Sequence, residues 1–342
     1  MTDVSFDSSR VNQRPGSTAL SAALTRLRRG DIRPAAAWVL ALAFYFTYAA
    51  LQPGTLSRSQ VGILCADTLS LAVLALGQGV VILTAGIDLS TGGVLSLGTA
   101  IAATHFSNAG STFAWSVAIL AIGVGAGMVN GLLIGRLGLQ PFIVTLATWS
   151  IFDGCALVVL PTQGGTVPGS FAAWINNSSV GLPNPVWALV VMAVLWLWFK
   201  RTPLARRIYA IGSDREGART AGVHLASTLT ATYMISGFCA GIASLFYAML
   251  TASGDPTAGD GLILPSVAAV VIGGTSLFGG QGGFIGSIAG ALTLTLLGDV
   301  IFVFSLPSYW TVLADGLLLI VAVLIGGGLQ LLQQGQAMKA RK

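Results

Sequence analysis

The chain has 342 residues, of which 54% are hydrophobic and only 8% are charged, and its mean hydropathy is +0.81. A soluble domain has about 25% charged residues, so this composition excludes an ordinary soluble protein and indicates a protein of the lipid bilayer. The net charge of +5 is therefore interpreted as a signal of membrane orientation, not of nucleic-acid binding. The 44 glycines predict close helix packing or broken helices.

Cysteine and histidine give no indication of a disulfide framework or a metal site. Cys65, Cys155 and Cys239 are widely separated, and each lies in an apolar run. His105 and His224 are far apart and have no zinc-ligand spacing around them. Metal catalysis is therefore not expected.

Ten apolar stretches follow one another and predict an all-α, polytopic bundle of about ten membrane helices, with eight to ten as the range. A membrane-spanning helix needs roughly 20 apolar residues, so the shortest stretches predict short, broken or re-entrant helices. One stretch also contains Pro265 and Gly273-Gly274, which interrupt helices. The ten stretches lie near 35–51, 60–84, 94–107, 113–135, 139–160, 186–199, 227–251, 262–280, 283–305 and 310–332.

The basic residues predict which helix ends face the cytosol. If the N-terminus is cytosolic, ten crossings place every lysine and arginine except Arg58 on the cytosolic side, as the positive-inside rule requires. The N- and C-termini are then both cytosolic. The predicted organisation is a cytosolic tail (1–34), a transmembrane domain (35–332) with a polar cytosolic segment (200–226), and a second cytosolic tail (333–342).

Two rows of glycine recur every four residues, a spacing that places them on one helix face. Such faces let two helix backbones approach closely in lipid, so we expect both rows to pack helices. The alternative, that these faces slide during a transport cycle, stays open at this stage. The rows are Gly123, Gly127, Gly131 and Gly135, and Gly282, Gly286 and Gly290.

Further glycines cluster beside polar residues where two apolar runs end. A membrane helix interrupted in this way can expose backbone groups to a watery cavity, so both clusters predict helix breaks. Gly86 aligns with Gly274 and Leu89 with Leu277, which leaves an internal duplication possible. The characteristic residues are Gly86, Asp88 and Ser90 in the first cluster and Gly273, Gly274 and Ser276 in the second.

The segment 200–226 predicts a two-turn helix with a cap at each end. Ser213 and Glu216 have the spacing of a capping box, and Asp214 suits the positive N-terminus of a helix. Gly222 is placed to end the helix. Two interpretations remain open: a connecting helix, or a docking element for a cytosolic partner.

Three passages resemble the permease subunits of bacterial ATP-binding-cassette importers of the ribose, xylose and arabinose type. They are residues 86–90, 140–146 and 268–280, and the resemblance extends over residues 60–326. It implies that the segment 200–226 contains a coupling helix, whose spacing is matched by Glu216, Ala218 and Gly222. The chain departs from the family pattern at the first alanine, which is replaced here by Gly217.

The resemblance implies an inner-membrane permease that imports a monosaccharide, a pentose or related sugar, by alternating access. It also implies a second permease copy, identical or paralogous, a nucleotide-binding ATPase subunit and a periplasmic sugar-binding protein. ATP and Mg²⁺ are expected on the ATPase, because none of this chain's lysines (Lys200, Lys339, Lys342) follows a glycine as a Walker loop requires. No nucleophile and base pattern indicates an enzyme, and no nucleic-acid partner is expected.

Polar side chains within the apolar stretches are candidates for the translocation path, because a charge at mid-bilayer costs about 2.5–3.5 kcal/mol. Helix packing is an open alternative for each of them. The acids among them, with Asp67 and Asp315, also keep open a different function: a stand-alone secondary transporter or channel coupled to protons or sodium. The path candidates are Gln78, Asn130, Gln140, Asp153 and Asp299.

Overall fold

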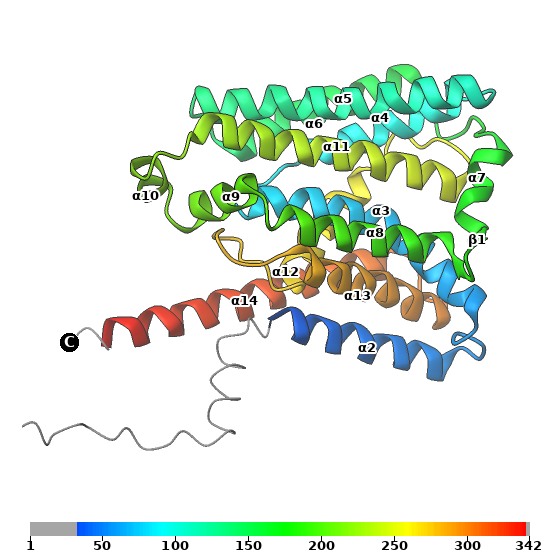
Figure 1. The fold of residues 1–342 in the computed structure, drawn as a ribbon. Helices are drawn as coiled ribbons and strands as arrows, with labels where there is room; N and C mark the ends of the chain where they lie inside the picture. Colours follow the sequence, from blue (N-terminus) through cyan, green and yellow to red (C-terminus); the bar gives the residue numbers. More distant parts are fainter. Residues whose placement is uncertain (1–32, 340–342) are drawn as a thin grey trace, which may run out of the picture. The chain divides into compact units, whose positions relative to one another are not determined.

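The computed structural model describes the backbone of residues 33–339 and the side chains of residues 33–324, so most of the predicted N-terminal tail lies outside it. This part of the chain is a helix bundle, as predicted, and it contains one small hairpin that was not predicted (Figure 1). Its elements are α2 (Arg33–Leu51), α3 (Arg58–Ile82), α4 (Ser90–His105), α5 (Ala109–Arg136), α6 (Pro141–Val159), α7 (Gly169–Asn176), β1 (Ser178–Ser179), β2 (Leu182–Pro183), α8 (Asn184–Phe199), α9 (Pro203–Ser213), α10 (Arg215–Thr220), α11 (Leu225–Thr251), α12 (Asp260–Ile272), α13 (Phe284–Val303) and α14 (Tyr309–Lys339).

Each predicted apolar stretch contains a helix, but helix length does not establish ten membrane spans. Within residues 33–324, six helices are long and apolar enough to cross a membrane, or seven if α8 and α9 form one bent span. Helices α4 and α12 have 16 and 13 residues, and the 13 residues of α12 extend over only about 20 Å. The loop 83–89, which contains Gly86, precedes α4, and the glycine-rich loop 273–283 follows α12, so short and broken helices occur where the sequence predicted them.

Helix α3 forms the centre of the bundle. Every residue from Thr68 to Ile82 is buried except Leu76, which is half-buried. The helix packs against α8, α11, α12 and α13 (Figure 1). Its many small residues allow neighbouring helices to approach closely on every side. As a result, the C-terminal end of α3 lies in the protein interior, and the loop after it buries Leu83, Gly86 and Asp88.

Helices α5 and α11 lie side by side along most of their length (Figure 1). The first glycine row lies on the face of α5 that contacts α11. A Cβ atom at any position in this row would overlap the backbone of α11. Only glycine permits this approach, so the row packs two helices at backbone contact. The row comprises Gly123, Gly127, Gly131 and Gly135, which oppose Gly237, Tyr233, Thr230 and Ala226 respectively.

The second glycine row does not form one helix face as predicted. Gly286 and Gly290 lie on α13 and contact the backbones of Gly273 and Ala269 at α12. Gly282 lies outside the helix, in the loop before it, with a φ of +127°. Its assignment to helix packing was wrong, because the four-residue spacing continues from α13 into a loop that needs glycine for its backbone conformation.

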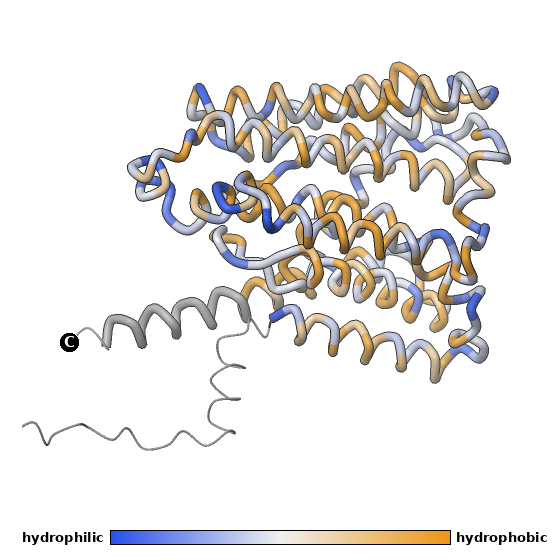
Figure 2. The backbone as a smooth tube through the Cα atoms, in the orientation of Figure 1, coloured by the Kyte–Doolittle hydropathy of each residue, from blue (hydrophilic) through white to orange (hydrophobic). Residues whose placement is uncertain are grey.

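The outer helices expose apolar side chains. Val158 on α6 is 84% exposed and Val312 on α14 is 74% exposed. Figure 2 shows that hydrophobic residues extend along the helices, whereas hydrophilic residues gather at the loops and at the segment of α9 and α10. An apolar surface of this extent suits hydrocarbon rather than water.

Candidate functional site

Helix α9 is part of the segment that connects α8 with α11, and it follows α8 after a bend of 77°. The hydroxyl of Thr202 caps its first turn by accepting a hydrogen bond from the backbone N–H of Ala205 at 3.2 Å, and Pro203 occupies the first helical position. Its buried face carries Ala205, Ile208 and Ile211. We did not predict this helix from the sequence, although the three-residue spacing of these apolar side chains is a helical signal.

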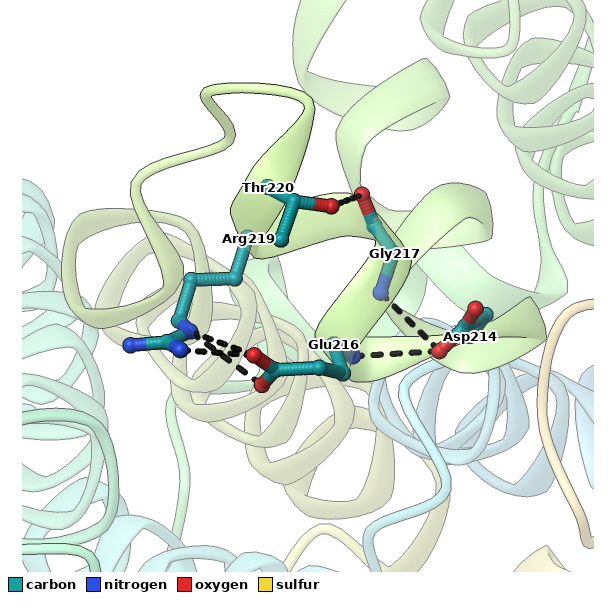
Figure 3. Close-up of polar contacts among 5 residues, drawn as sticks. All are labelled: Asp214, Glu216, Gly217, Arg219 and Thr220. Atoms are coloured by element: carbon teal, nitrogen blue, oxygen red, sulfur yellow. Dashed lines mark hydrogen bonds and ion pairs between the residues drawn. The ribbon is translucent and has the colours of Figure 1, made fainter.

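Helix α10 is capped by Asp214, not by Ser213 as predicted. Asp214 Oδ1 accepts hydrogen bonds from the N–H groups of Glu216 at 3.1 Å and Gly217 at 3.0 Å (Figure 3). Ser213 instead ends α9, where its hydroxyl donates to the carbonyl of Tyr209 at 2.9 Å. A carboxylate one residue nearer to α10 takes the capping role, because it also suits the positive helix end. The helix has six residues and is shorter than the predicted two turns.

Local interactions keep α10 compact. The guanidinium of Arg219 donates to both carboxylate oxygens of Glu216, with the shortest contact at 2.6 Å (Figure 3). These hydrogen bonds and the charge of Glu216 raise the pKa of Arg219. At the other end, Gly222 has a φ of +83°, and the N–H of Val223 donates to the carbonyl of Ala218 at 3.0 Å. This is a Schellman motif, so Gly222 ends the helix as predicted.

Two loops interrupt membrane helices close to α9. We call residues 83–89, between α3 and α4, the first break, and residues 273–283, between α12 and α13, the second break. The first break contains Gly86 and Asp88 of the first glycine cluster, whose Ser90 begins α4, and the second break contains Gly273, Gly274 and Ser276 of the second cluster. The breaks contact each other directly, because the N–H of Gly280 donates to the carbonyl of Leu83 at 3.0 Å.

The C-terminal end of α9 contacts both breaks. The hydroxyl of Tyr209 donates to the carbonyl of Gly282 in the second break at 2.7 Å. Gly212 lies so close that a Cβ atom there would overlap the carbonyl oxygen of Leu83 and the nitrogen of Gly280. Helix α9 is therefore in direct contact with both breaks.

Asp88 in the first break is the centre of a buried polar network. Its Oδ1 accepts hydrogen bonds from the backbone N–H of Ser90 at 3.1 Å and from the Ser90 hydroxyl at 2.5 Å. The Ser90 hydroxyl in turn accepts from Nδ2 of Asn130 on α5 at 2.8 Å. The side-chain amide of Gln78 on α3 donates to the Asp88 carbonyl at 3.0 Å and accepts from its N–H at 3.3 Å. Since all four residues are at most 1% exposed, the network ties α3, α4 and α5 together in the interior.

The network joins two groups of residues that were predicted separately. Gln78 and Asn130 were candidates for the translocation path, whereas Asp88 and Ser90 were assigned to a helix break. Tyr233 on α11 borders the network, because a Cβ atom at Gly86 would lie 2.7 Å from its hydroxyl. Tyr233 is fully buried and was not predicted. No sequence signal distinguishes it from other aromatic residues in apolar helices.

The other path candidates lie in three separate places. Gln140 is exposed at the start of α6 and makes no side-chain cap there. Asp153 lies further along α6, with its backbone close to Gly93 of α4. Asp299 lies in the C-terminal half of α13, within electrostatic reach of Asp67 on α3. The structure does not bring these three into one site.

The second break is held mainly by backbone contacts. Gly273 packs against the backbone of α13, and Gly274 has a φ of +88°, a conformation that favours glycine. The hydroxyl of Ser276 accepts a hydrogen bond from the N–H of Phe278 at 3.2 Å, while its backbone N–H donates to the carbonyl of Gln281 at 3.0 Å. This break therefore forms a compact turn without a buried acid.

Comparison with known proteins places the chain in a transport family. A family model described as branched-chain amino acid transport system / permease component matches residues 61–323. The chain belongs to this family. Among its relatives, the ribose import permease protein of Haemophilus influenzae is 36% identical over 261 residues, which cover 74% of this chain and 80% of that protein. The fructose import permease protein of Rhizobium meliloti is 37% identical over 265 residues, which cover 74% of this chain and 73% of that protein.

A third relative, the D-allose transport system permease protein of Escherichia coli, is 32% identical over 256 residues, which cover 73% of this chain and 78% of that protein. No solved structure gives a significant match.

Because the chain belongs to this permease family and has at least six apolar helices of spanning length, it is a multi-pass protein of the bacterial inner membrane. The matched region agrees with the predicted resemblance and contains both breaks, the Asp88 network and helices α9 and α10. Membership in this family argues against a stand-alone secondary transporter or channel.

Proposed function

We propose that this permease is the membrane subunit of an importer that moves a monosaccharide, a pentose or related sugar, inward by alternating access. ATP and Mg²⁺ bind to a separate ATPase subunit, and a periplasmic sugar-binding protein delivers the substrate to a pair of permease subunits, identical or paralogous. The sugar import permeases among the relatives support this assignment.

The contact of α9 with both breaks is the observation that carries the proposal. Helix α10 is exposed, compact and capped, so it can be moved as a unit by a partner that binds it. Because α9 ends where α10 begins, such a movement displaces Gly212 and Tyr209 against the two breaks. Backbone conformation changes at breaks more easily than within helices, so α4 and α13 can reorient relative to α3 and α12.

The same end of the bundle is proposed to face the cytosol. Arg33 lies beside the second break, where it donates to the side chain of Gln281 at 3.1 Å. Arg136 ends α5, next to the start of α11. With the basic residues of α9 and α10, these positions follow the positive-inside rule, whereas Arg58 starts α3 at the opposite end.

The docking role of α10 can be tested with Glu216→Lys. The permease would be co-expressed with its ATPase and sugar-binding protein, and ATP-dependent uptake of labelled ribose, allose and fructose would be measured in proteoliposomes. We expect at least a tenfold loss of uptake and weaker co-purification with the ATPase. The change removes the acid of α10 and adds a third cation to the two already there, Arg215 and Arg219. Arg219→Gln is the matched control: it removes the same ion pair but keeps the carboxylate, so uptake should remain close to wild type.

Two outcomes would contradict the proposal. Unchanged uptake in the Glu216→Lys variant would exclude docking through this helix. Uptake that needs no ATPase and collapses with a protonophore would instead support a secondary transporter driven by its membrane acids.

A further inference from the structure

The bend between α8 and α9 places four basic side chains on the surface. Lys200 and Arg201 lie in the bend, Arg206 and Arg207 lie on α9, and all four are exposed. No acidic residue occurs from position 184 to position 213. We call these four residues the elbow cluster. Its charge of +4 is not balanced by any acid in the two helices that carry it.

The part of α8 that leads to the elbow cluster has a lipid-facing surface. Leu195, Leu197 and Trp198 are each more than half exposed, and Trp198 reaches 68%. Tryptophan is enriched where hydrocarbon meets lipid headgroups. Because Trp198 lies two residues before Lys200, the cluster begins at the depth of the headgroups. Figure 2 shows this change from the hydrophobic α8 to the hydrophilic start of α9.

Helix α9 directs its charges away from the protein. Ala205, Ile208 and Ile211 are buried against the bundle, whereas Arg206 and Arg207 remain exposed beside them. The bend of 77° turns α9 nearly across the direction of α8, so α9 runs along the membrane surface if α8 crosses the bilayer. A surface helix with exposed arginines is the arrangement that attracts anionic lipid.

We propose that the elbow cluster binds the headgroup phosphates of anionic phospholipids in the cytosolic leaflet. The proposal rests on the orientation given in the proposed function. Guanidinium groups hold phosphate oxygens with paired hydrogen bonds, and each basic residue near an anionic membrane strengthens binding about fivefold. The lipid-exposed face of α8 leads directly into the cluster, which favours a lipid over an acidic protein surface.

Bound lipid anchors α9 at the membrane surface. When the ATPase displaces α10, an anchored α9 turns against the breaks instead of lifting away from them. Transport is therefore expected to depend on anionic lipid, although the cluster itself lies outside both breaks.

The test compares Arg206→Gln/Arg207→Gln with wild type. Native mass spectrometry in detergent would measure the affinity for phosphatidylglycerol and for zwitterionic phosphatidylcholine. We expect at least a tenfold loss of phosphatidylglycerol affinity and no change for phosphatidylcholine. The control Arg58→Gln/Arg136→Gln removes the same charge elsewhere and should lose far less, and Arg206→Lys/Arg207→Lys should restore most of the affinity.

Uptake in vesicles provides the second measurement. Wild type should lose activity when phosphatidylglycerol is replaced by phosphatidylcholine. Unchanged phosphatidylglycerol affinity in the Gln variant would overturn the proposal, and so would an equal loss in the control. A Gln variant that loses only the ATPase in co-purification would also overturn it and identify the cluster as a protein-docking surface. If lipid affinity falls but wild-type uptake needs no ATPase, the lipid site stands and the proposed function fails.

Discussion

The two breaks end their helices in the same way, but the residues that come next differ in polarity and burial. After α3, Ala85 has a φ of +61°, and after α12, Gly274 has a φ of +88°. In each case this residue donates its N–H to a carbonyl three residues back, and the next residue donates to one five residues back. Only the first break then buries a carboxylate, that of Asp88, whereas the second forms a turn around Ser276.

This difference separates two tasks. The first break is fixed in the interior by side chains from α3, α4 and α5, so it can act as a pivot. The second break lies nearer the surface, exposes Phe278 and packs on α9, so it can transmit a push. In the proposed transport mechanism, similar helix ends would therefore have different mechanical roles, because their neighbouring loop residues are not alike.

The largest expected effect is a difference in stability between variants that remove a polar side chain from the first break and from the second. Asp88→Ala removes the acceptor of two buried hydrogen bonds and should lower the free energy of unfolding by about 3 kcal/mol. Ser276→Ala, the equivalent change in the second break, should cost about 1 kcal/mol or less, because the hydrogen bond that its hydroxyl accepts from Phe278 is exposed. Thermal unfolding in detergent measures both. Equal losses would show that the first break is not the better anchored one.

A smaller effect is expected where α9 contacts both breaks. Gly212→Val introduces a side chain into the space of the Leu83 carbonyl, which should cost about 2 kcal/mol and separate α9 from the breaks. Uptake should fall strongly while the ATPase still hydrolyses ATP. Gly261→Val on α12 is the control, since that glycine has open space around it. Coupled uptake at the wild-type level in Gly212→Val would show that this contact does not transmit movement.

The smallest effects concern Ala85 and Gly274, the two residues after α3 and α12 whose backbone has the left-handed conformation. Ala85→Gly should stabilise the permease by about 0.5–1 kcal/mol, because an L-residue with positive φ is strained and glycine is not. Gly274→Ala should destabilise it by about 1 kcal/mol or more, because the new Cβ also meets Arg33. Unfolding midpoints should therefore shift in opposite directions. A shift in the same direction would contradict the shared helix-end geometry.

The sequence predicted the helices well, because long apolar runs report burial in lipid or protein directly. It also predicted the α5 glycine face, because three consecutive four-residue steps place four glycines on one side of a helix. The same spacing misled at Gly282, where a loop residue continues the row by coincidence. Likewise, Ser213 and Asp214 both suit a helix start, and only the end of α9 decides between them.

The site was harder to predict, because a polar residue in an apolar stretch does not reveal which neighbouring element its side chain contacts. Gln78 and Asn130 were expected to line a path, yet the amide of Gln78 bonds to Asp88 in the first break and that of Asn130 bonds to Ser90 at the start of α4. A sequence shows that a polar group lies in an apolar helix, but not which loop its neighbours bring to it. Helix α9 was missed for another reason: its four basic or polar side chains masked a narrow apolar face.

The contact between α5 and α11 has a kinematic consequence. Gly123 and Gly237 each occupy the space that a side chain of the other would need, so the two backbones interlock at this point. A screw motion that brought Val124 or Phe238 into this position would drive its side chain onto the opposite backbone. The pair is therefore expected to move as a single rigid body. In the proposed transport cycle, the conformational change would then occur in the shorter helices α4 and α12.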